Sequence, residues 1–241
     1  MKLALLGYGK MGQEIEKAAL ERGHTIVLVI DINNQNELTR ENLLKADVAI
    51  DFTTPASVVH NILTCFKTGI PVVCGTTGWN KDLQKITAIC IENNQTLIHS
   101  SNFSIGVNIL FAINEYLAGI MNKYTQYDVR MEETHHTQKL DAPSGTAISL
   151  AEQIISGIER KKVWSLENHG SPENILIKAT REGDIKGIHE IIYESEVDLI
   201  TLKHFAKSRK GLALGAVLAA EYVKNRKGVF TMRDLLGMVI K

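Results

Sequence analysis

The stretch KLALLGYGKMG, residues 2–12, decides the fold of the N-terminal half of the chain. Its first residues form a short apolar run, which is typical of a buried parallel strand. Glycines break this run too early for a signal peptide, and the following QEIEKAALERG has helical spacing. Gly7 permits a tight turn, Gly9 lets the backbone approach a pyrophosphate, and Gly12 lets the helix pack close to the strand. Strand, glycine turn and helix in this order predict a dinucleotide-binding unit.

A second apolar run, HTIVLVID (24–31), supplies the acidic residue that such a unit needs. Asp31 ends this run, roughly 20 residues after the glycine turn, where a carboxylate can accept hydrogen bonds from both hydroxyls of an adenosine ribose. The glycine pattern alone is a weak signal, because glycine-rich turns also occur in other βαβ units. The strand, the helix and the spaced acid together favour a dinucleotide site.

Three further apolar runs end in polar loops and alternate with helical segments expected at 56–68 and 80–93. In an open parallel sheet, ligands bind beyond the carboxyl ends of the strands. Taken singly, each loop would be an ordinary turn, but together with the glycine turn they predict a shared cleft for a nicotinamide and its ribose. These runs are ADVAIDFTTP (46–55), IPVVCGTTGW (70–79) and TLIHSSNFSIGVN (96–108).

The pattern changes after residue 108 and indicates a second, α+β domain with a mixed or antiparallel, mostly open sheet. TQYDVRMEETHH (125–136) alternates as a strand does, with Tyr127, Val129 and Met131 on one side. The fold class is therefore α/β: a Rossmann-like dinucleotide-binding domain followed by an α+β domain. The remaining expected elements are helices at 106–122, 145–159, 211–222 and 229–239, and strands within 174–183 and 189–206.

The segment EETHHTQKLDAPSGTA, residues 132–147, carries the chemistry of the C-terminal half. His135, His136 and Lys139 follow the end of a strand, where an imidazole can move a proton near neutral pH and an ammonium can donate one or pair with a carboxylate. Ser144, Gly145 and Thr146 then open a helix, whose N–H groups and hydroxyls can bind an anion. A lone histidine is more often structural, but this constellation predicts proton donors beside a carboxylate receptor.

Composition excludes several classes of protein. The chain of 241 residues has 27 basic and 27 acidic residues, and so lacks the basic excess of a nucleic-acid binder. No apolar run reaches the roughly 18 residues of a membrane span. Cys65, Cys74 and Cys90 show no CxxC spacing, and free thiols of this kind fit a reducing cytoplasm. No His/Cys cluster has zinc spacing, so we expect no metal site.

The segment EETHHTQKLDAPSGTA resembles the signature of the dihydrodipicolinate reductase family, now called 4-hydroxy-tetrahydrodipicolinate reductases. The resemblance runs the length of the chain and includes the GTTG loop at 75–78, the loop SSNFS at 100–104 and the stretch REGDIKGIHE at 181–190. HFAKSRKGLALGAV and FTMRDLL also resemble the family's C-terminal pattern. The spacing His-His-x-x-Lys-x-Asp-Ala-Pro-Ser-Gly-Thr is highly specific.

This resemblance implies an enzyme of the diaminopimelate route to lysine that uses NADH and/or NADPH. The cofactor would deliver hydride to a ring that carries two carboxylates and an imine, and water would be lost. In the family the last helices return to the N-terminal domain, and four subunits associate through their C-terminal sheets. We therefore expect a cytoplasmic homotetramer whose dinucleotide-binding domain is 1–105 plus 211–241 and whose substrate-binding and oligomerisation domain is 106–210.

The resemblance also implies the roles of single residues. His135 and Lys139 match the catalytic histidine and the proton-donating lysine, and the remaining matches fall into two groups. The substrate-binding matches are His136, Ser144, Gly145 and Thr146. The cofactor-binding matches are Gly7, Tyr8, Gly9, Lys10, Met11, Gly12, Asp31, Gly75, Thr76, Thr77, Ser100, Ser101, Asn102 and Phe103.

Two departures from the family pattern bear on the choice of cofactor. Many members have a longer glycine loop, with one more residue between the first and last glycines. Many also place an arginine after the Asp or Glu, where it meets the 2′-phosphate of NADP, and here that position is Ile32. Asp31 would repel a 2′-phosphate, whereas Lys10 would attract one. We expect NADH to be used at least as well as NADPH.

Two other readings stay open from the residues alone. Aspartate and homoserine dehydrogenases also begin with GxGxxG, although they lack the His-His-x-x-Lys loop. A regulator that senses NAD(H) without turnover would share the dinucleotide fold, although a degraded catalytic loop would be expected there. An absorbance assay on the cyclic substrate separates the three.

Overall fold

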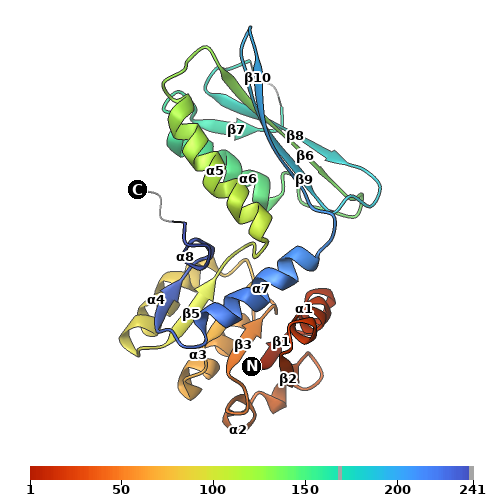
Figure 1. Ribbon diagram of the computed structural model, residues 1–241, viewed down its shortest axis with the longest axis vertical. Helices are drawn as coiled ribbons and strands as arrows, with labels where there is room; N and C mark the ends of the chain where they lie inside the picture. Colours follow the sequence, from red (N-terminus) through yellow and green to blue (C-terminus); the bar gives the residue numbers. More distant parts are fainter. Residues whose placement is uncertain (168–169, 239–241) are drawn as a thin grey trace. The chain divides into compact units, whose positions relative to one another are not determined.

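The computed structural model describes residues 1–167 and 170–238 and contains two compact units (Figure 1). The first unit is Met1–Ile105 with Arg209–Lys241, and the second is Gly106–Ser208. The first unit is thus discontinuous in sequence, and residues 239–241, which we expected to belong to it, lie outside the described residues. Each unit is built on its own sheet and has its own core.

The first unit is a six-stranded sheet in which every neighbouring pair of strands is parallel. The strand order is β11-β5-β4-β3-β1-β2, which confirms the Rossmann-like sheet expected from the sequence. Each apolar run of this half of the chain therefore forms a strand, and the polar loop that follows it lies at the carboxyl edge of the sheet. The strands are β1 (Lys2–Leu6), β2 (Thr25–Ile30), β3 (Val48–Asp51), β4 (Val72–Cys74), β5 (Thr96–His99) and β11 (Gly228–Phe230).

Helices cover both faces of this sheet, because its strands are apolar on both sides. In β1, Leu3 and Leu5 pack with residues of α1 and α7, whereas Ala4 and Leu6 pack with residues of α3 and α4. Helices α1 and α7 lie side by side on their face (Figure 1). The helices of this unit are α1 (Lys10–Glu21), the short η1 (Gln35–Glu37) and α2 (Arg40–Leu43), α3 (Val58–Thr68), α4 (Asn80–Glu92), α7 (Lys210–Val223) and α8 (Met232–Leu235).

The end of the chain differs from its sequence prediction. We expected one helix over 229–239, but residues 228–230 form β11 and only Met232–Leu235 form α8. β11 adds to the edge of the sheet beside β5, where the Gly228 amide donates to the Gln95 carbonyl at 2.9 Å. Thr231 and Asp234 form a capping box that starts the helix after the strand. Residue 239 of the expected helix lies outside the described residues.

The second unit is a five-stranded mixed sheet, as expected, covered on one face by two helices. β6 pairs antiparallel with β9 and parallel with β8, and the strand order is β10-β9-β6-β8-β7. Apolar residues of α5 (Ile105–Met121) and α6 (Gly145–Gly157) pack on the sheet. Within the described ranges, no helix is both long and apolar enough to span a bilayer. The strands are β6 (Asp128–His135), β7 (Val163–Ser165), β8 (Asn174–Arg181), β9 (Ile188–Glu194) and β10 (Leu199–Phe205).

We predict that Gly215→Ala destabilises the first unit. A Cβ atom at Gly215, in α7, would lie 1.7 Å from the carbonyl oxygen of Phe103 in the loop after β5, so the helix or that loop must shift. Overpacking of this kind costs about 1–3 kcal/mol or more, measured as a loss in the free energy of unfolding in urea.

Gly211→Ala is the matched control in the same helix. A Cβ atom there meets only the Ser104 hydroxyl oxygen at 3.7 Å, an ordinary contact. Alanine is also the better helix former, so this variant should be as stable as the wild type or more so. Equal stability of the two variants would contradict the close packing of α7.

Candidate active site

The alternation of β6 places two polar side chains inside the second unit. Val129 and Met131 are buried against the helices, and the same alternation continues to Glu133 and His135, which are 1% and 7% exposed. β6 ends at His135, so both polar side chains lie at the end of the strand that leads into the 136–144 loop. The last two inward-facing positions of β6 are thus ionisable residues, Glu133 and His135, and the site is built around them.

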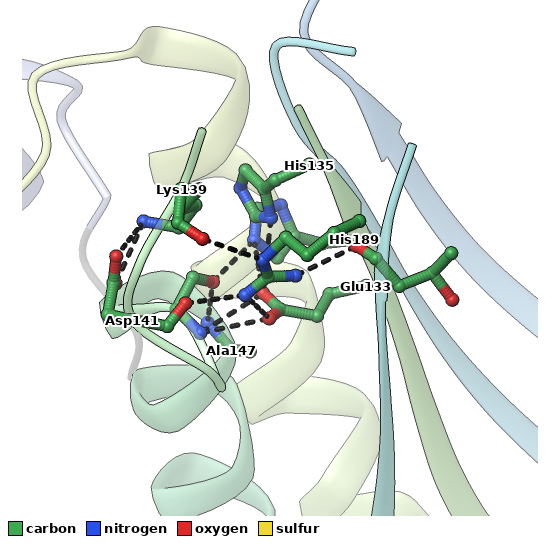
Figure 2. A network of polar contacts seen from close by, with 9 residues as sticks. Glu133, His135, Lys139, Asp141, Ala147 and His189 are labelled. Carbon is green, nitrogen blue, oxygen red and sulfur yellow. Dashed lines mark hydrogen bonds and ion pairs between the residues drawn. The ribbon is translucent and has the colours of Figure 1, made fainter. Parts of the chain in front are cut away.

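Glu133 is the centre of this polar cluster (Figure 2). Its Oε1 lies 3.1 Å from Nη2 of Arg181, and the backbone N–H of Ser144 donates to both carboxylate oxygens at 3.0 and 3.2 Å. Its Oε2 faces Nδ1 of His135 at 3.4 Å and Nε2 of His189 at 3.7 Å. A buried carboxylate without such partners would be strongly destabilising. Glu133 thus ties β6 to β8, β9 and the start of α6.

His135 is held in its neutral form by its surroundings. Burial lowers the pKa of His135, and the positive charges of Lys139 and Arg181 lower it further, against the opposing effect of Glu133. Its ring meets the ring of His189 edge to face, with centroids 5.1 Å apart. A neutral imidazole can accept a proton or a hydrogen bond at neutral pH. This makes His135 suited to proton exchange with a bound molecule.

His189 is a buried, uncharged neighbour and not a proton carrier at neutral pH. Burial lowers the pKa of His189 to about 3, and the positive forms of His135, His204 and Lys139 add to the effect. Its Nε2 lies 3.1 Å from the hydroxyl of Ser144, whose oxygen also accepts the N–H of Ala147. His189 therefore helps to fix the residue that caps α6.

Lys139 and Asp141 form the outer part of the site. The Lys139 ammonium donates to both oxygens of Asp141, at 2.7 and 2.8 Å, and this contact lowers the pKa of the Asp141 carboxyl. Arg181 donates from Nε to the Lys139 carbonyl at 3.3 Å and also to the Asp141 carbonyl. The guanidinium that neutralises Glu133 thus also holds the loop that carries the lysine.

The N-terminus of α6 offers an anion site beside this cluster. Ser144 is the N-cap, and its side chain accepts the N–H of Ala147. Gly145 is exposed, and a Cβ atom there would meet, outside its own helix turn, no atom of the described residues within 4 Å, so packing against the described residues does not require glycine. The first-turn N–H groups, those of Gly145 and Thr146 among them, and the helix dipole favour negative charge here.

His136 lies just beyond the strand and has a different environment. It is half-buried, and its carbonyl accepts the N–H of Lys139 at 3.1 Å, which closes a turn. Its Nδ1 is buried and has no hydrogen-bond partner within the described part of the chain. Of the residues expected in this segment, the structure thus gathers His135, Lys139 and Ser144 around Glu133 and Arg181.

Glu133, His135 and His189 also have the donor atoms of a metal site. Their ligand atoms all lie within 4.8 Å of one another. However, both oxygens of Glu133 already accept hydrogen bonds from Ser144, and the guanidinium of Arg181 would repel a dication at the same carboxylate. The cluster fits a hydrogen-bonded charge network better than a metal centre.

Three members of this network were not predicted from the sequence as site residues: Glu133, Arg181 and His189. Glu133 continues the apolar alternation of β6, and an acid on the inner face of a strand is itself a signal of a paired, functional group. Arg181 and His189 lie in REGDIKGIHE, a stretch whose signal in the sequence is its resemblance to the family. Their meeting with Glu133 depends on β8 and β9 flanking β6, which the sequence does not specify.

In the first unit, the three glycines of the turn differ in what surrounds them. Gly7 has φ +91°, and a Cβ atom there would lie 2.2 Å from the Phe52 carbonyl oxygen. A Cβ atom at Gly12 would lie 2.2 Å from the Gly7 carbonyl oxygen, so the helix sits directly on the turn. Gly9 is the exposed N-cap of α1, and a Cβ atom added there would meet no atom of the described residues within 4 Å. Packing requires glycine at 7 and 12, whereas position 9 leaves room for a ligand.

Asp31 and Ile32 follow β2 next to this turn. Oδ1 of Asp31 accepts the N–H of Asn33 at 2.7 Å. The backbone N–H of Asp31 donates to Oδ1 of Asn34, also at 2.7 Å. The side chain of Ile32 is 84% exposed. Lys10, at the start of α1, is also exposed.

The remaining candidate cofactor residues lie beyond β4 and β5, and two of them are largely buried. Thr76 is 4% exposed and Phe103 is 1% exposed. Phe103 packs on Phe52 with ring centroids 5.9 Å apart, so its side chain belongs to the core. In the β5 loop, Ser100 donates to the Asn102 carbonyl at 2.7 Å. Thr77 and Ser101 are exposed, and Gly75 is partly buried; so are Tyr8 and Met11, which lie in the glycine turn after β1 and at the start of α1.

The parallel sheet, its glycine turn and the polar carboxyl ends define the class of dinucleotide-binding α/β folds. The chain belongs to the dihydrodipicolinate reductase family. The family model for the N-terminus of dihydrodipicolinate reductase matches residues 1–103, and the model for its C-terminus matches residues 106–236.

Relatives and solved structures agree with this assignment. The chain is 48% identical to a 4-hydroxy-tetrahydrodipicolinate reductase of Christiangramia forsetii, over the whole of both chains. It is 35% identical to the same-named protein of Methanocaldococcus jannaschii, over 97% of this chain and 81% of that one. A dipicolinate-bound dihydrodipicolinate reductase from a Paenisporosarcina species aligns with a TM-score of 0.80 at 27% identity, over 96% of this chain and 97% of that one.

We predict that His189 makes the stability of the protein fall in acid. In the unfolded chain this histidine has its ordinary pKa of 6.5, whereas in the folded protein its pKa is lowered to about 3. The unfolded state thus binds an extra proton in this window, and stability is lost as the pH falls from about 6.5 towards 3 at up to about 1.4 kcal/mol per pH unit. His189→Gln should flatten the slope measured by urea unfolding at stepped pH. The exposed His60→Gln should keep the wild-type slope, and an unchanged slope in both variants would contradict the buried, neutral state.

Proposed function

We propose that the chain reduces 4-hydroxy-tetrahydrodipicolinate to tetrahydrodipicolinate with loss of water, using NADH or NADPH, in the diaminopimelate route to lysine. The observation that carries this proposal is the buried cluster of Glu133, His135 and Arg181 beside Lys139 and the N-terminus of α6. Full-length identity to proteins named for this reductase supports it. So does the likeness to a structure that is described as dipicolinate-bound.

The first unit is proposed to bind the dinucleotide, with its domain taken as 1–105 plus 211–241. The glycine turn would face the pyrophosphate, where the exposed Gly9 leaves room for a close approach. Asp31 would accept hydrogen bonds from the adenosine ribose. The bound cofactor supplies the hydride. The proposed contacts are Gly7, Tyr8, Gly9, Lys10, Met11, Gly12, Asp31, Gly75, Thr76, Thr77, Ser100, Ser101, Asn102 and Phe103.

The second unit, taken as 106–210, is proposed to bind the cyclic dicarboxylate. One carboxylate would lie at the first turn of α6, because helix N-termini favour anions and because a Cβ atom at Gly145 would find open space among the described residues. The half-buried His136, whose Nδ1 has no partner within the described ranges, is a polar group available to the same ligand. The proposed substrate contacts are His136, Ser144, Gly145 and Thr146.

Proton supply is proposed to come from Lys139, with His135 as its partner in the exchange. Negative charge builds on the substrate ring as hydride arrives, and a proton donor at that moment lowers the barrier by roughly two to four orders of magnitude in rate. Lys139 carries the proton on an ammonium that Asp141 and the Arg181-bound loop hold in place. His135, neutral because it is buried, can take a proton and return it.

We also propose a homotetramer in a reducing cytoplasm. Edge strand β10 exposes Leu199, Ile200 and Phe205, which would be covered if sheets of the second unit met. The three cysteines are free and buried, which suits a reducing compartment. Sedimentation of the purified protein tests the assembly.

We predict that Lys139→Ala and His135→Ala each cut turnover by at least about a hundredfold, because general acid–base help is lost. The assay follows nicotinamide absorbance with the cyclic substrate, and nucleotide affinity is measured in parallel by calorimetry. Nucleotide affinity should persist in both variants, because the changed residues lie in the second unit.

Lys123→Ala and His60→Ala are the controls, because both side chains are exposed and lie outside the cluster. They should keep wild-type turnover. Normal turnover in both Lys139→Ala and His135→Ala would contradict their proposed roles. A wild-type protein that binds nucleotide but does not turn over the cyclic substrate would favour a regulator that senses NAD(H).

We predict that NADH serves at least as well as NADPH. The Asp31 carboxylate would repel a 2′-phosphate, and the exposed Ile32 offers it no cation, although Lys10 attracts it. The measurement is the ratio of kcat/KM for the two cofactors, and Asp31→Asn should shift that ratio towards NADPH. A strong NADPH preference in the wild type would contradict this.

A further inference from the structure

A second buried carboxylate, Asp51, lies at the end of β3 in the first unit. It is 0% exposed, and within the described part of the chain no lysine, arginine or histidine pairs with it. Its Oδ1 accepts the N–H and hydroxyl of Thr53 at 3.0 and 2.7 Å and the hydroxyl of Thr76 at 2.8 Å. Its Oδ2 accepts an N–H of Asn61 at 2.8 Å. Four hydrogen bonds therefore replace a counter-ion.

The hydrogen-bond directions around Asp51 fit a carboxylate rather than a neutral acid. The Thr76 hydroxyl oxygen accepts the N–H of Thr53 at 2.8 Å, and the Thr53 hydroxyl oxygen accepts an N–H of Asn61 at 3.3 Å. Each hydroxyl is thus used as an acceptor by an amide and has its own proton left for Asp51. Burial raises the pKa of Asp51 above its ordinary value, and the four hydrogen bonds reduce that rise without cancelling it.

These contacts join two loops that follow adjacent strands. Thr53 belongs to the loop after β3, Thr76 belongs to the loop after β4, and Asn61 comes from α3 behind them. The Gly75 amide adds a backbone bond to the Asp51 carbonyl at 2.9 Å. Asp51 thus fixes the spacing of the two loops at the carboxyl edge of the sheet.

The strand order indicates which part of a dinucleotide these loops would meet. The order runs β4-β3-β1-β2, with the glycine turn after β1 and Asp31 after β2. A dinucleotide with its adenosine over β2 and its pyrophosphate over β1 continues across β3 and β4. The loops held by Asp51 lie on the nicotinamide side.

We propose that Asp51 is a positioning residue of the cofactor site, whose buried carboxylate holds the loops after β3 and β4 in the arrangement that receives the nicotinamide half. The proposal rests on the proposed function of the first unit. Asp51 itself does not touch the cofactor, and it acts through Thr53 and Thr76.

The test is Asp51→Asn, which keeps the shape of the side chain. All four partners of Asp51 are donors, so the amide N–H of asparagine would face a donor, and its amide oxygen is a weaker acceptor than a carboxylate. Calorimetry compares NADH with ADP, which lacks the nicotinamide half. We expect the NADH affinity to fall about tenfold or more, the scale of one lost hydrogen bond to a charged group, while the ADP affinity changes less than about twofold. A purely structural role would change both affinities alike or neither.

Asn61→Ala is the second variant, for the case in which Asp51→Asn does not fold. It removes one donor to Asp51 and should give a smaller NADH loss with ADP unchanged. Thr96→Val is the control for stability, because the Thr96 hydroxyl donates to the Arg226 carbonyl at 2.6 Å at the opposite end of the sheet. It should lower the melting temperature and leave both affinities unchanged.

The outcomes separate the two proposals. The role of Asp51 is overturned if a folded Asp51→Asn binds NADH as tightly as the wild type. If Asp51→Asn does not fold, the same result in Asn61→Ala overturns it. Equal losses for NADH and ADP overturn it as well. Failure of the wild type to bind NADH, NADPH and ADP would instead overturn the dinucleotide function of the unit.

Discussion

A carboxylate taken out of water must find donors, and this constraint organises the second unit. Glu133 lies inside because β6 alternates, and its charge then requires Arg181 from β8 and the Ser144 amide at the start of α6. The same arginine reaches the carbonyls of Lys139 and Asp141. One buried charge therefore sets the position of the proposed proton donor, the neutral imidazole and the proposed anion-binding end of α6.

The first unit uses the same principle with different partners. Asp51 is buried at the end of its strand, but its donors are hydroxyls and amides instead of a guanidinium. Asp51 is the last residue of β3 and Glu133 lies two residues before the end of β6, so both carboxylates are close to a loop whose geometry a site needs fixed. A side chain that accepts several donors at once can order such a loop without adding bulk to it.

Much of this fold was predictable because local patterns settle it. The turn at Gly7 and Gly12 and the alternation of β6 are short-range properties, and both appear in the structure. The network around Glu133 was not predictable, because Arg181 and His189 reach it through strand neighbours that no local pattern specifies. β11 was missed for a similar reason, since three residues become a strand only by pairing with β5.

The discontinuity of the first unit has a consequence for how the protein is made. Residues of α7, among them Ala213, Ala216 and Val217, complete the apolar layer on one face of its sheet. A ribosome releases these residues only after the whole of 106–208 has been synthesised. The inserted unit therefore has all its strands available first, and one face of the nascent N-terminal sheet is until then covered by α1 alone, which leaves part of it exposed to chaperones and to mispairing.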